Sequence, residues 1–229
     1  MKYSFILLDA DNTLFDFDAS EKAALTAAFS DLHISATPEL LGAYHKINIA
    51  YWAMLAENKI EKKLLYSERF RELFARFSIT GDPIAMQNSY RKHLNEQHIL
   101  YDGAEFFLSA LYPSYLLFLI TNGDKLTQRR RLRDSGIDKY FADVFISDEI
   151  GYEKPDVGFF DYAASHIDNF SREKCLVVGD GLKTDIRGAI NYGLDCVWFN
   201  PLSLPPEKGI AATHVSKSFD DIIDWLSRQ

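Results

Sequence analysis

Two aspartates, Asp9 and Asp11, stand two residues apart at the end of a short apolar run that begins at Phe5. In an extended chain the side chains at positions i and i+2 point the same way, so both carboxylates are expected to leave a strand together. Two carboxylates held that close repel each other unless a cation lies between them or one of them binds a proton. The pair predicts either a Mg²⁺ site with one nucleophilic and one acid–base carboxylate, or simply a strand that ends in an Asp/Asn turn.

A second polar group, Thr121-Asn122-Gly123, stands where another apolar run breaks. A threonine hydroxyl and exposed backbone N–H groups are suitable donors to a phosphate. An ordinary Asn-Gly turn explains the same residues. Lys154 precedes Pro155 at a predicted helix start, where it could supply a compact positive charge to a phosphoryl group or could be a solvated lysine.

A third polar group, Gly179-Asp180-Gly181, ends the apolar run that begins at Cys175. Asp180 is expected to point into the same crevice as Asp9, because ligands of open α/β sheets bind outside the carboxyl ends of the strands. Asp185 falls near the first turn of the following helix. There it could interact with the helix dipole, or it could hold the lysine or a metal-bound water in place.

The elements that must position these residues alternate between strands and helices in most of the chain. Apolar runs predict strands over residues 3–9, 116–121, 144–147, 175–179 and 195–199. Helical periodicity predicts helices over residues 105–111, from Gly123 to Ser135, 155–167, 183–192 and 219–226. Such alternation is typical of βαβ units and a mostly parallel sheet, whose strands end at a common edge.

Residues 19–98 differ, because their apolar positions recur only with the period of a helix. The expected fold is therefore a three-layer, Rossmann-like α/β core of residues 1–16 and 99–229. An all-helical domain of residues 17–98 is inserted after the first strand. On this arrangement the polar groups at the strand ends converge, and together they supply what phosphoryl transfer requires.

Composition restricts the partners of this 229-residue chain, which carries a formal net charge of −8. No basic surplus exists to neutralise a nucleic-acid polymer. The apolar run from Tyr115 to Ile120 is far too short to span a bilayer, and the N-terminal segment is unlike a signal peptide. Cys175 and Cys196 lie in strand-like runs and are expected to be buried free thiols, which fits a cytoplasmic protein. The six histidines are scattered and are interpreted as structural or surface residues.

Four short motifs resemble, in order, the four sequence motifs of the haloacid dehalogenase (HAD) superfamily: Asp9-Ala-Asp11-Asn-Thr13, Thr121-Asn122-Gly123, Lys154-Pro155 and Gly179-Asp180…Asp185. The resemblance implies a C1-type helical cap and an aspartyl-phosphate mechanism. Asp9 would attack phosphorus, while Asp11 would protonate the leaving alcohol and then deprotonate the hydrolytic water.

The same resemblance implies how the cofactor and the substrate are held. Mg²⁺ would be bound by Asp9, Asp180 and the backbone carbonyl of Asp11. The remaining roles are phosphate binding by Thr121, the Asn122 backbone and Lys154, and support from Asp185. Gly181 departs from the pattern, because many relatives carry a small hydroxyl residue there.

Longer stretches around these motifs are similar to the pyrimidine 5′-nucleotidase subgroup: residues 9–18, 120–131 and 146–155. This implies a nucleoside monophosphate substrate. The expected assembly is a monomer or a homodimer. The alternatives are a phosphoglycolate or sugar-phosphate phosphatase, a β-phosphoglucomutase-like phosphotransferase and a non-catalytic interaction protein, whereas Asp11 argues against a dehalogenase.

Two side-chain groups outside the motifs could also bind substrate. Cap aromatics could stack on a base, although residues at helical spacing are more often core: Phe17, Tyr44, Tyr51 and Trp52. The run Arg129-Arg130-Arg131 is interpreted as a solvated helix face with one buried stem.

Overall fold

The computed structural model describes residues 1–57 and 59–229. The chain divides into two compact units, one of Met1–Phe17 with Ile99–Gln229 and one of Asp18–His98. The first unit is built on a parallel sheet and is called the sheet unit below. The second is made of helices and is called the helical unit.

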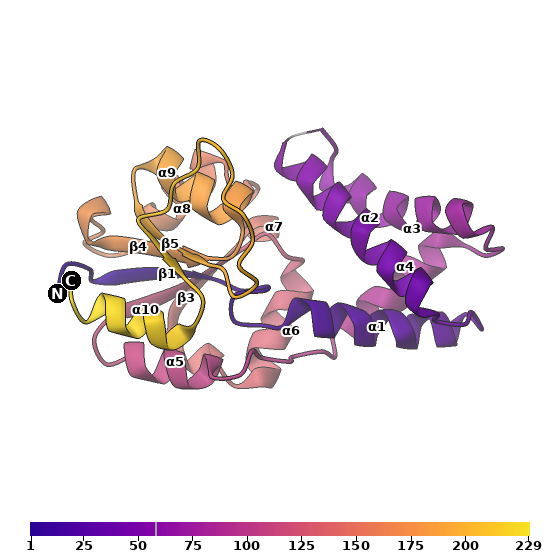
Figure 1. Ribbon diagram of the computed structural model, residues 1–229, viewed down its shortest axis with the longest axis horizontal. Coiled ribbons are helices and arrows are strands. Elements are labelled where there is room, and N and C mark those ends of the chain that lie inside the picture. Colours follow the sequence, from indigo (N-terminus) through magenta and orange to yellow (C-terminus); the bar gives the residue numbers. More distant parts are fainter. Residues whose placement is uncertain (58) are drawn as a thin grey trace. The chain divides into compact units, whose positions relative to one another are not determined.

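The sheet unit contains a six-stranded parallel sheet with the strand order β3-β2-β1-β4-β5-β6. In Figure 1 this sheet lies between two layers of helices. Its strands are β1 (Phe5–Asp9), β2 (Leu116–Thr121), β3 (Phe141–Ile146), β4 (Cys175–Gly179), β5 (Asp195–Phe199) and β6 (His214–Ser216). The chain moves outward through β2 and β3 on one side of β1, and through β4, β5 and β6 on the other. The strand order therefore reverses between β1 and β4, and this switch point is where open α/β sheets bind ligands.

Alternate residues of each central strand enter two different cores. In β1, Ile6 and Leu8 face one hydrophobic cluster, whereas Phe5 and Leu7 face the other. Near-continuous apolar sequence is what a parallel sheet requires when helices cover both of its faces. The prediction of a three-layer α/β core is therefore confirmed.

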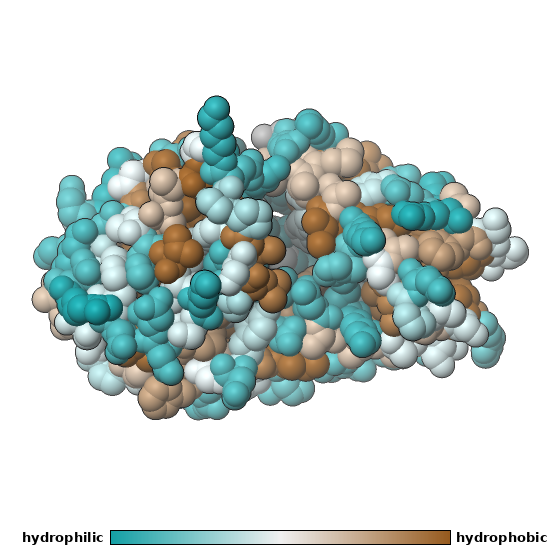
Figure 2. Space-filling model, in the orientation of Figure 1, coloured by the Kyte–Doolittle hydropathy of each residue, from teal (hydrophilic) through white to brown (hydrophobic). Residues whose placement is uncertain are grey.

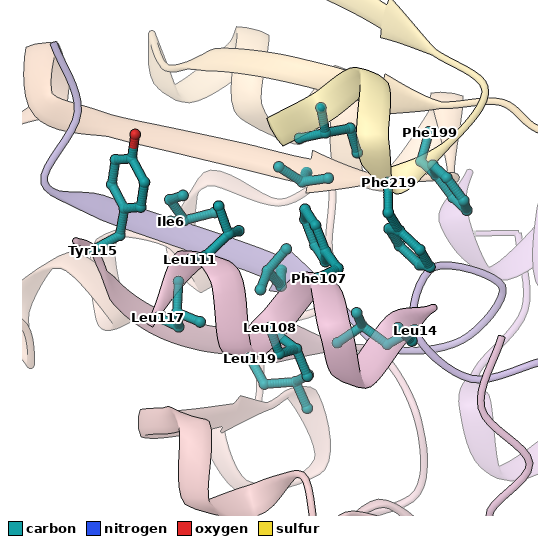
Figure 3. Close-up of a cluster of buried hydrophobic side chains, with 14 of the residues drawn as sticks. Ile6, Leu14, Phe107, Leu108, Leu111, Tyr115, Leu117, Leu119, Phe199 and Phe219 are labelled. Carbon is teal, nitrogen blue, oxygen red and sulfur yellow. The ribbon is translucent and has the colours of Figure 1, made fainter. Parts of the chain in front are cut away.

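The helices α5 (Ala104–Leu111) and α10 (Phe219–Leu226) cover one face, and α8 (Val157–Ser165) and α9 (Arg187–Tyr192) cover the other. In the first cluster, the Phe219 ring stacks on Phe107 at 4.7 Å and on Phe199 at 4.9 Å between ring centroids (Figure 3). Burying a side chain of this size stabilises the fold by about 1.5–3 kcal/mol. These layers fix the strand ends that carry the polar groups.

Several elements differ in extent from those predicted. Strand β3 begins at Phe141, and β6 was not predicted. Helix α8 begins at Val157 rather than Pro155, because the Asp156 side chain accepts the backbone N–H of Gly158 and caps the helix there. Helix α6 (Lys125–Ser135) begins after Asp124, whose side chain accepts the Thr127 N–H, and it ends at Gly136 in a left-handed conformation.

The chain leaves the sheet unit after Phe17 and re-enters it at Ile99. These two points are neighbours, because Asp16 N donates to Ile99 O at 3.0 Å and Phe15 forms a β-bridge with Leu100. The inserted segment thus begins and ends at one place on the sheet unit.

The helical unit contains α1 (Phe17–Asp31), α2 (Pro38–Ala56), α3 (Lys62–Phe77) and α4 (Pro83–Leu94). Proline at the first position of α2 and α4 follows the caps Thr37 and Asp82, whose side chains accept backbone N–H groups. Tyr44 is fully buried in the core of this unit, as its helical spacing indicated.

No described helix is long and apolar enough to cross a membrane. Hydrophilic residues cover most of the face in Figure 2, and hydrophobic residues form small separate groups among them.

Candidate active site

Polar side chains meet at the carboxyl ends of β1, β2 and β4. Asp9 pairs with Ile120 across β1 and β2, and Leu8 pairs with Val178 across β1 and β4. This register brings Asp9, Thr121 and Asp180 to one sheet edge, beside the switch point. Lys154 reaches the same edge from the loop after α7 (Ser147–Ile150), which follows β3.

Asp9 is buried at the end of β1 and both of its carboxylate oxygens accept hydrogen bonds. Lys154 Nζ lies 2.7 Å from Asp9 Oδ1, and Thr13 Oγ1 donates to Oδ2 at 3.0 Å. Thr13 also accepts the backbone N–H of Asp180 at 3.1 Å, so one hydroxyl connects β1 with the end of β4. Asp9 is thereby fixed in one orientation.

Lys154 uses its ammonium group inside the protein, where the residue is only 1% exposed. Its three contacts are Asp185 Oδ1 at 2.6 Å, Asp9 Oδ1 at 2.7 Å and the carbonyl of Ile120 at 3.0 Å. Burial alone would lower the pKa of Lys154, but the carboxylates of Asp185 and Asp9 outweigh it and hold that pKa above its ordinary value. The lysine is therefore a cation that satisfies all three of its donors.

Asp180 and Asp185 follow β4 on a turn that glycine makes possible. Asp180 O accepts the indole N–H of Trp198 at 2.8 Å, and Asp185 Oδ2 accepts the Gly181 N–H at 2.9 Å. A side chain at Gly179 would collide with the Asp185 carboxyl group, whose carbon would lie 2.6 Å from the added Cβ. Glycine at 179 is therefore what lets the Asp185 carboxylate approach β4.

Three carboxylates, those of Asp9, Asp180 and Asp185, each offer an oxygen within 4.8 Å of the others. Burial and the charge of Asp185 together raise the pKa of Asp9 to about 7, against the opposing effect of Lys154. Burial and the charge of Asp9 likewise raise the pKa of Asp180 well above its ordinary value.

One ammonium group cannot balance three carboxylates, so two negative charges are left over when all are ionised. A hard divalent cation prefers oxygen ligands of this kind and would remove that repulsion, so the residues fit a metal ion. The carboxylate of Asp11 lies outside this cluster of described residues, and Asp185 lies inside it.

Thr121 ends β2 and Asn122 follows it, and their side chains differ in what they can offer a ligand. Thr121 Oγ1 accepts the Gly123 N–H at 3.0 Å and the Gln128 amide at 2.9 Å, which leaves its hydroxyl proton to donate to a ligand. The Asn122 side chain is occupied, because it donates to Lys154 O and accepts Lys154 N–H, both at 2.8 Å. A ligand could therefore contact Asn122 only through its backbone while that pair persists.

Asp11 is turned toward α6. Arg131 Nη1 lies 2.5 Å from Asp11 Oδ1, and Gln128 Nε2 donates to Asp11 Oδ2 at 2.5 Å. The Arg131 side chain is 1% exposed and its guanidinium lies 4.4 Å from the centre of the Phe15 ring. The interpretation of residues 129–131 as a solvated face with one buried stem is wrong for Arg131, whose charge is buried as well.

Sequence reasoning assigned no role to four residues that contact the site: Thr13, Gln128, Arg131 and Trp198. Gln128 and Arg131 are three residues apart and so share one face of α6, immediately after a strand that ends in the site. The spacing predicts that the two residues share a face of the helix, but it does not show that this face turns inward.

Known proteins resemble this chain in sequence and in fold. The family model for haloacid dehalogenase-like hydrolases matches residues 3–193. The chain is 35% identical over 226 residues to the putative HAD-hydrolase YfnB of Bacillus subtilis, which covers 99% of this chain and 96% of that protein. A crystal structure of YfnB bound to magnesium matches with a TM-score of 0.95 at 34% identity, over 99% of both chains.

Two further relatives are similar over their full length. The pyrimidine 5′-nucleotidase PynA of Streptococcus pneumoniae is 36% identical over 229 residues, covering 100% of this chain and 97% of that protein. The pyrimidine 5′-nucleotidase YjjG of Escherichia coli is 32% identical over 228 residues, covering 100% of both.

Proposed function

This chain belongs to the haloacid dehalogenase-like hydrolase family, and we propose that it hydrolyses phosphate monoesters, with pyrimidine nucleoside 5′-monophosphates as its preferred substrates. The observation that carries the chemistry is Asp9, a buried carboxylate held by Lys154 beside a second carboxylate, Asp11, from the same strand end. The substrate class rests on the full-length similarity to PynA and YjjG.

The proposed metal is Mg²⁺, held by Asp9, Asp180 and the backbone carbonyl of Asp11, with Asp185 beside them. Three clustered carboxylates and the magnesium bound to the related YfnB support it. When bound, Mg²⁺ would supply positive charge to the phosphoryl oxygens as negative charge builds on them.

In the first step, a carboxylate oxygen of Asp9 attacks phosphorus in line with the ester oxygen. The new bond joins Asp9 to phosphorus, and the bond from phosphorus to the alcohol oxygen breaks. Asp11 gives its proton to that oxygen, so the nucleoside leaves as a neutral alcohol. Thr13 and Lys154 keep Asp9 oriented for this attack.

In the second step, Asp11 takes a proton from water and the water oxygen attacks phosphorus. The bond between phosphorus and Asp9 breaks, which returns the carboxylate and releases inorganic phosphate. The hydroxyl of Thr121 and the backbone N–H of Asn122 donate to the phosphoryl oxygens. Lys154 can also donate to them once Asp9 is esterified, because the ester no longer holds its negative charge.

We assign substrate selection to the helical unit, as a cap domain of residues 17–98. It is one contiguous insertion that follows the first motif. Closure of such a unit would exclude water until substrate is bound.

The first test is phosphate release with Mg²⁺ from dUMP, dTMP, UMP, AMP, phosphoglycolate and several sugar phosphates. The proposal expects kcat/KM for the pyrimidine nucleotides to exceed the others. Preference for phosphoglycolate or a sugar phosphate would overturn the substrate class and keep the chemistry. No release from any ester would overturn both.

The second test is Asp9→Asn, with Asp168→Asn as the matched control on the exposed surface. Loss of the nucleophile should reduce kcat on the order of 10⁴-fold or more. The fold should persist, because the change removes one of several mutually repelling buried carboxylates. Phosphate release near the wild-type rate, with both variants folded by circular dichroism, would refute Asp9 as the nucleophile.

A further inference from the structure

We propose that Gln128 and Arg131 on α6 are positioning residues that hold the acid–base carboxylate Asp11 and connect it to the phosphate site at Thr121. The inference rests on the proposed function, because it assigns a purpose to contacts made by the proposed acid–base group. It concerns two side chains that lie outside the four motifs.

The contacts form a continuous chain between the two functions. The Gln128 amide nitrogen has two protons, and it donates one to Asp11 Oδ2 at 2.5 Å and one to Thr121 Oγ1 at 2.9 Å. The Gln128 carbonyl oxygen lies 3.4 Å from Arg131 Nη1, which also contacts Asp11 Oδ1 at 2.5 Å. Both oxygens of Asp11 are therefore oriented from one helix.

The burial of Arg131 argues that this arrangement is specific. A guanidinium charge is costly to remove from water unless a partner of opposite charge compensates it. Here the side chain is 1% exposed, whereas its neighbours Arg129 and Arg130 are 48% and 46% exposed. Arg131 alone in this run turns inward, to Asp11 and to the face of the Phe15 ring.

The held carboxylate can still do chemistry. A carboxyl group has about four lone-pair sites, and the two contacts use one on each oxygen. One of the remaining sites carries the proton when Asp11 acts as the acid, and the same site is free to accept a proton when Asp11 acts as the base. The Asp11 side chain is 28% exposed, so its remaining sites can reach a leaving-group oxygen or a water. Fixing the rotamer in advance places the proton donor without an ordering cost at the moment of reaction.

Gly123 provides an independent observation. A Cβ atom at this position would collide with the Gln128 side chain, whose Cδ would lie 2.8 Å away. The turn after β2 therefore leaves the space that Gln128 occupies. Gln128 can occupy its position beside Asp11 only because residue 123 has no side chain.

The experiment compares Arg131→Met and Gln128→Met with Arg130→Met, an exposed arginine of the same helix. Two substrates separate the proton transfers: dUMP, whose alkoxide needs a proton to leave, and p-nitrophenyl phosphate, whose phenolate does not. We expect Arg131→Met to lower kcat for dUMP roughly 10- to 100-fold, less than the upper limit of general acid–base catalysis. KM should stay within about twofold, because Asp11 does not bind the ground-state phosphate.

With p-nitrophenyl phosphate, the first step should be spared while the hydrolysis of the phosphoenzyme slows. The variants should therefore show a burst of p-nitrophenol that Arg130→Met lacks. Arg131→Lys should recover part of kcat, since it restores the cation. Adding Arg131→Met to Asp11→Asn should cause little further loss, because both changes remove the same function.

A merely structural role predicts a different result. Equal losses on both substrates without a burst, or losses that multiply with those of Asp11→Asn, would overturn the inference while wild-type activity sustains the proposed function. If the wild type releases no phosphate from either ester, the proposed function fails and this inference fails with it. Gln128→Met, which keeps the volume of the side chain, tests the same idea if Arg131→Met does not fold.

Discussion

The surroundings of Asp9 shift its pKa in opposite directions. Burial and the neighbouring carboxylates raise its pKa to about 7, whereas Lys154 favours the anion. Asp9 must be ionised to act as a nucleophile. With a pKa of about 7, only about half of the Asp9 carboxyl groups would be ionised at neutral pH. A divalent cation in the carboxylate cluster would restore the anion, which makes metal binding and ionisation one event.

Mg²⁺ binding is accordingly expected to release protons. Because the pKa of Asp9 is raised to about 7, the metal-free site holds part of a proton near neutrality, which Mg²⁺ must displace. The raised pKa of Asp180 acts in the same direction. The affinity should therefore increase as pH rises from about 6 to 8. Calorimetric titration in buffers of different ionisation enthalpy measures both quantities, and Asp180→Asn should weaken binding. An affinity independent of pH would contradict the prediction.

Gly181 and Thr184 form a second pair at the residue scale. A Cβ at 181 would collide with the hydroxyl of Thr184 and would lie 2.8 Å from Asp185 Oδ2, so a side chain at this position requires these neighbours to shift. Gly181→Ser should destabilise the protein by about 1–3 kcal/mol, as overpacking does. Gly181→Ser with Thr184→Ala should recover part of this. Urea unfolding of the single and double variants tests it, and a neutral Gly181→Ser would refute it.

At the scale of elements, strand ends and helix faces differ in how well sequence predicts them. Asp9, Thr121 and Asp180 were predictable because each directly follows an apolar run, and parallel strands share one edge. Arg131 was not, because its partner lies 120 residues away and local periodicity cannot show which arginine of three turns inward. Strand β6 was missed because three residues, of which only Ser216 is buried, carry no periodic signal.

An ion pair between α1 and α2 predicts that the stability of the fold depends on pH. His45 Nδ1 lies 2.8 Å from Glu21 Oε2, and this hydrogen bond raises the pKa of His45 above its ordinary 6.5. A raised pKa in the folded state means that the stabilisation is fully present below about 6.5 and is lost as pH rises through the folded value. Because the histidine is partly exposed, the effect belongs to the range of about 0–1 kcal/mol for surface pairs.

His45→Gln should therefore flatten the dependence of unfolding free energy on pH between about 6 and 9. Urea midpoints for the wild type and the variant at both ends of that range measure the difference. An equal pH dependence in the two proteins would show that the pair does not couple folding to protonation. His33→Gln, on an exposed turn, is a suitable control.

At the scale of the whole molecule, the two cysteines report on the integrity of the sheet. Cys175 and Cys196 lie on the adjacent strands β4 and β5, both buried and both free thiols. Burial raises the pKa of Cys175 to about 12 and also raises that of Cys196. A thiol reacts as its thiolate, so neither cysteine should react at neutral pH while the sheet unit is folded.

The rate of modification by a disulfide reagent should therefore follow the opening of the sheet unit. It should be slow in buffer, and it should rise with urea in parallel with loss of the circular dichroism signal. Cys175→Ala and Cys196→Ala assign the two reactions. Rapid labelling of either thiol in the native protein would show that β4 or β5 opens locally.

The hydrogen bond between Asp16 N and Ile99 O bears on how the protein could evolve as well as on its structure. Because the two ends of the inserted segment lie next to each other, another segment could replace it if its own two ends lie equally close together. Recombination could replace the inserted helices and leave every strand end untouched. On the proposed assignment of substrate selection to the helical unit, recognition and reaction chemistry could thus be inherited separately.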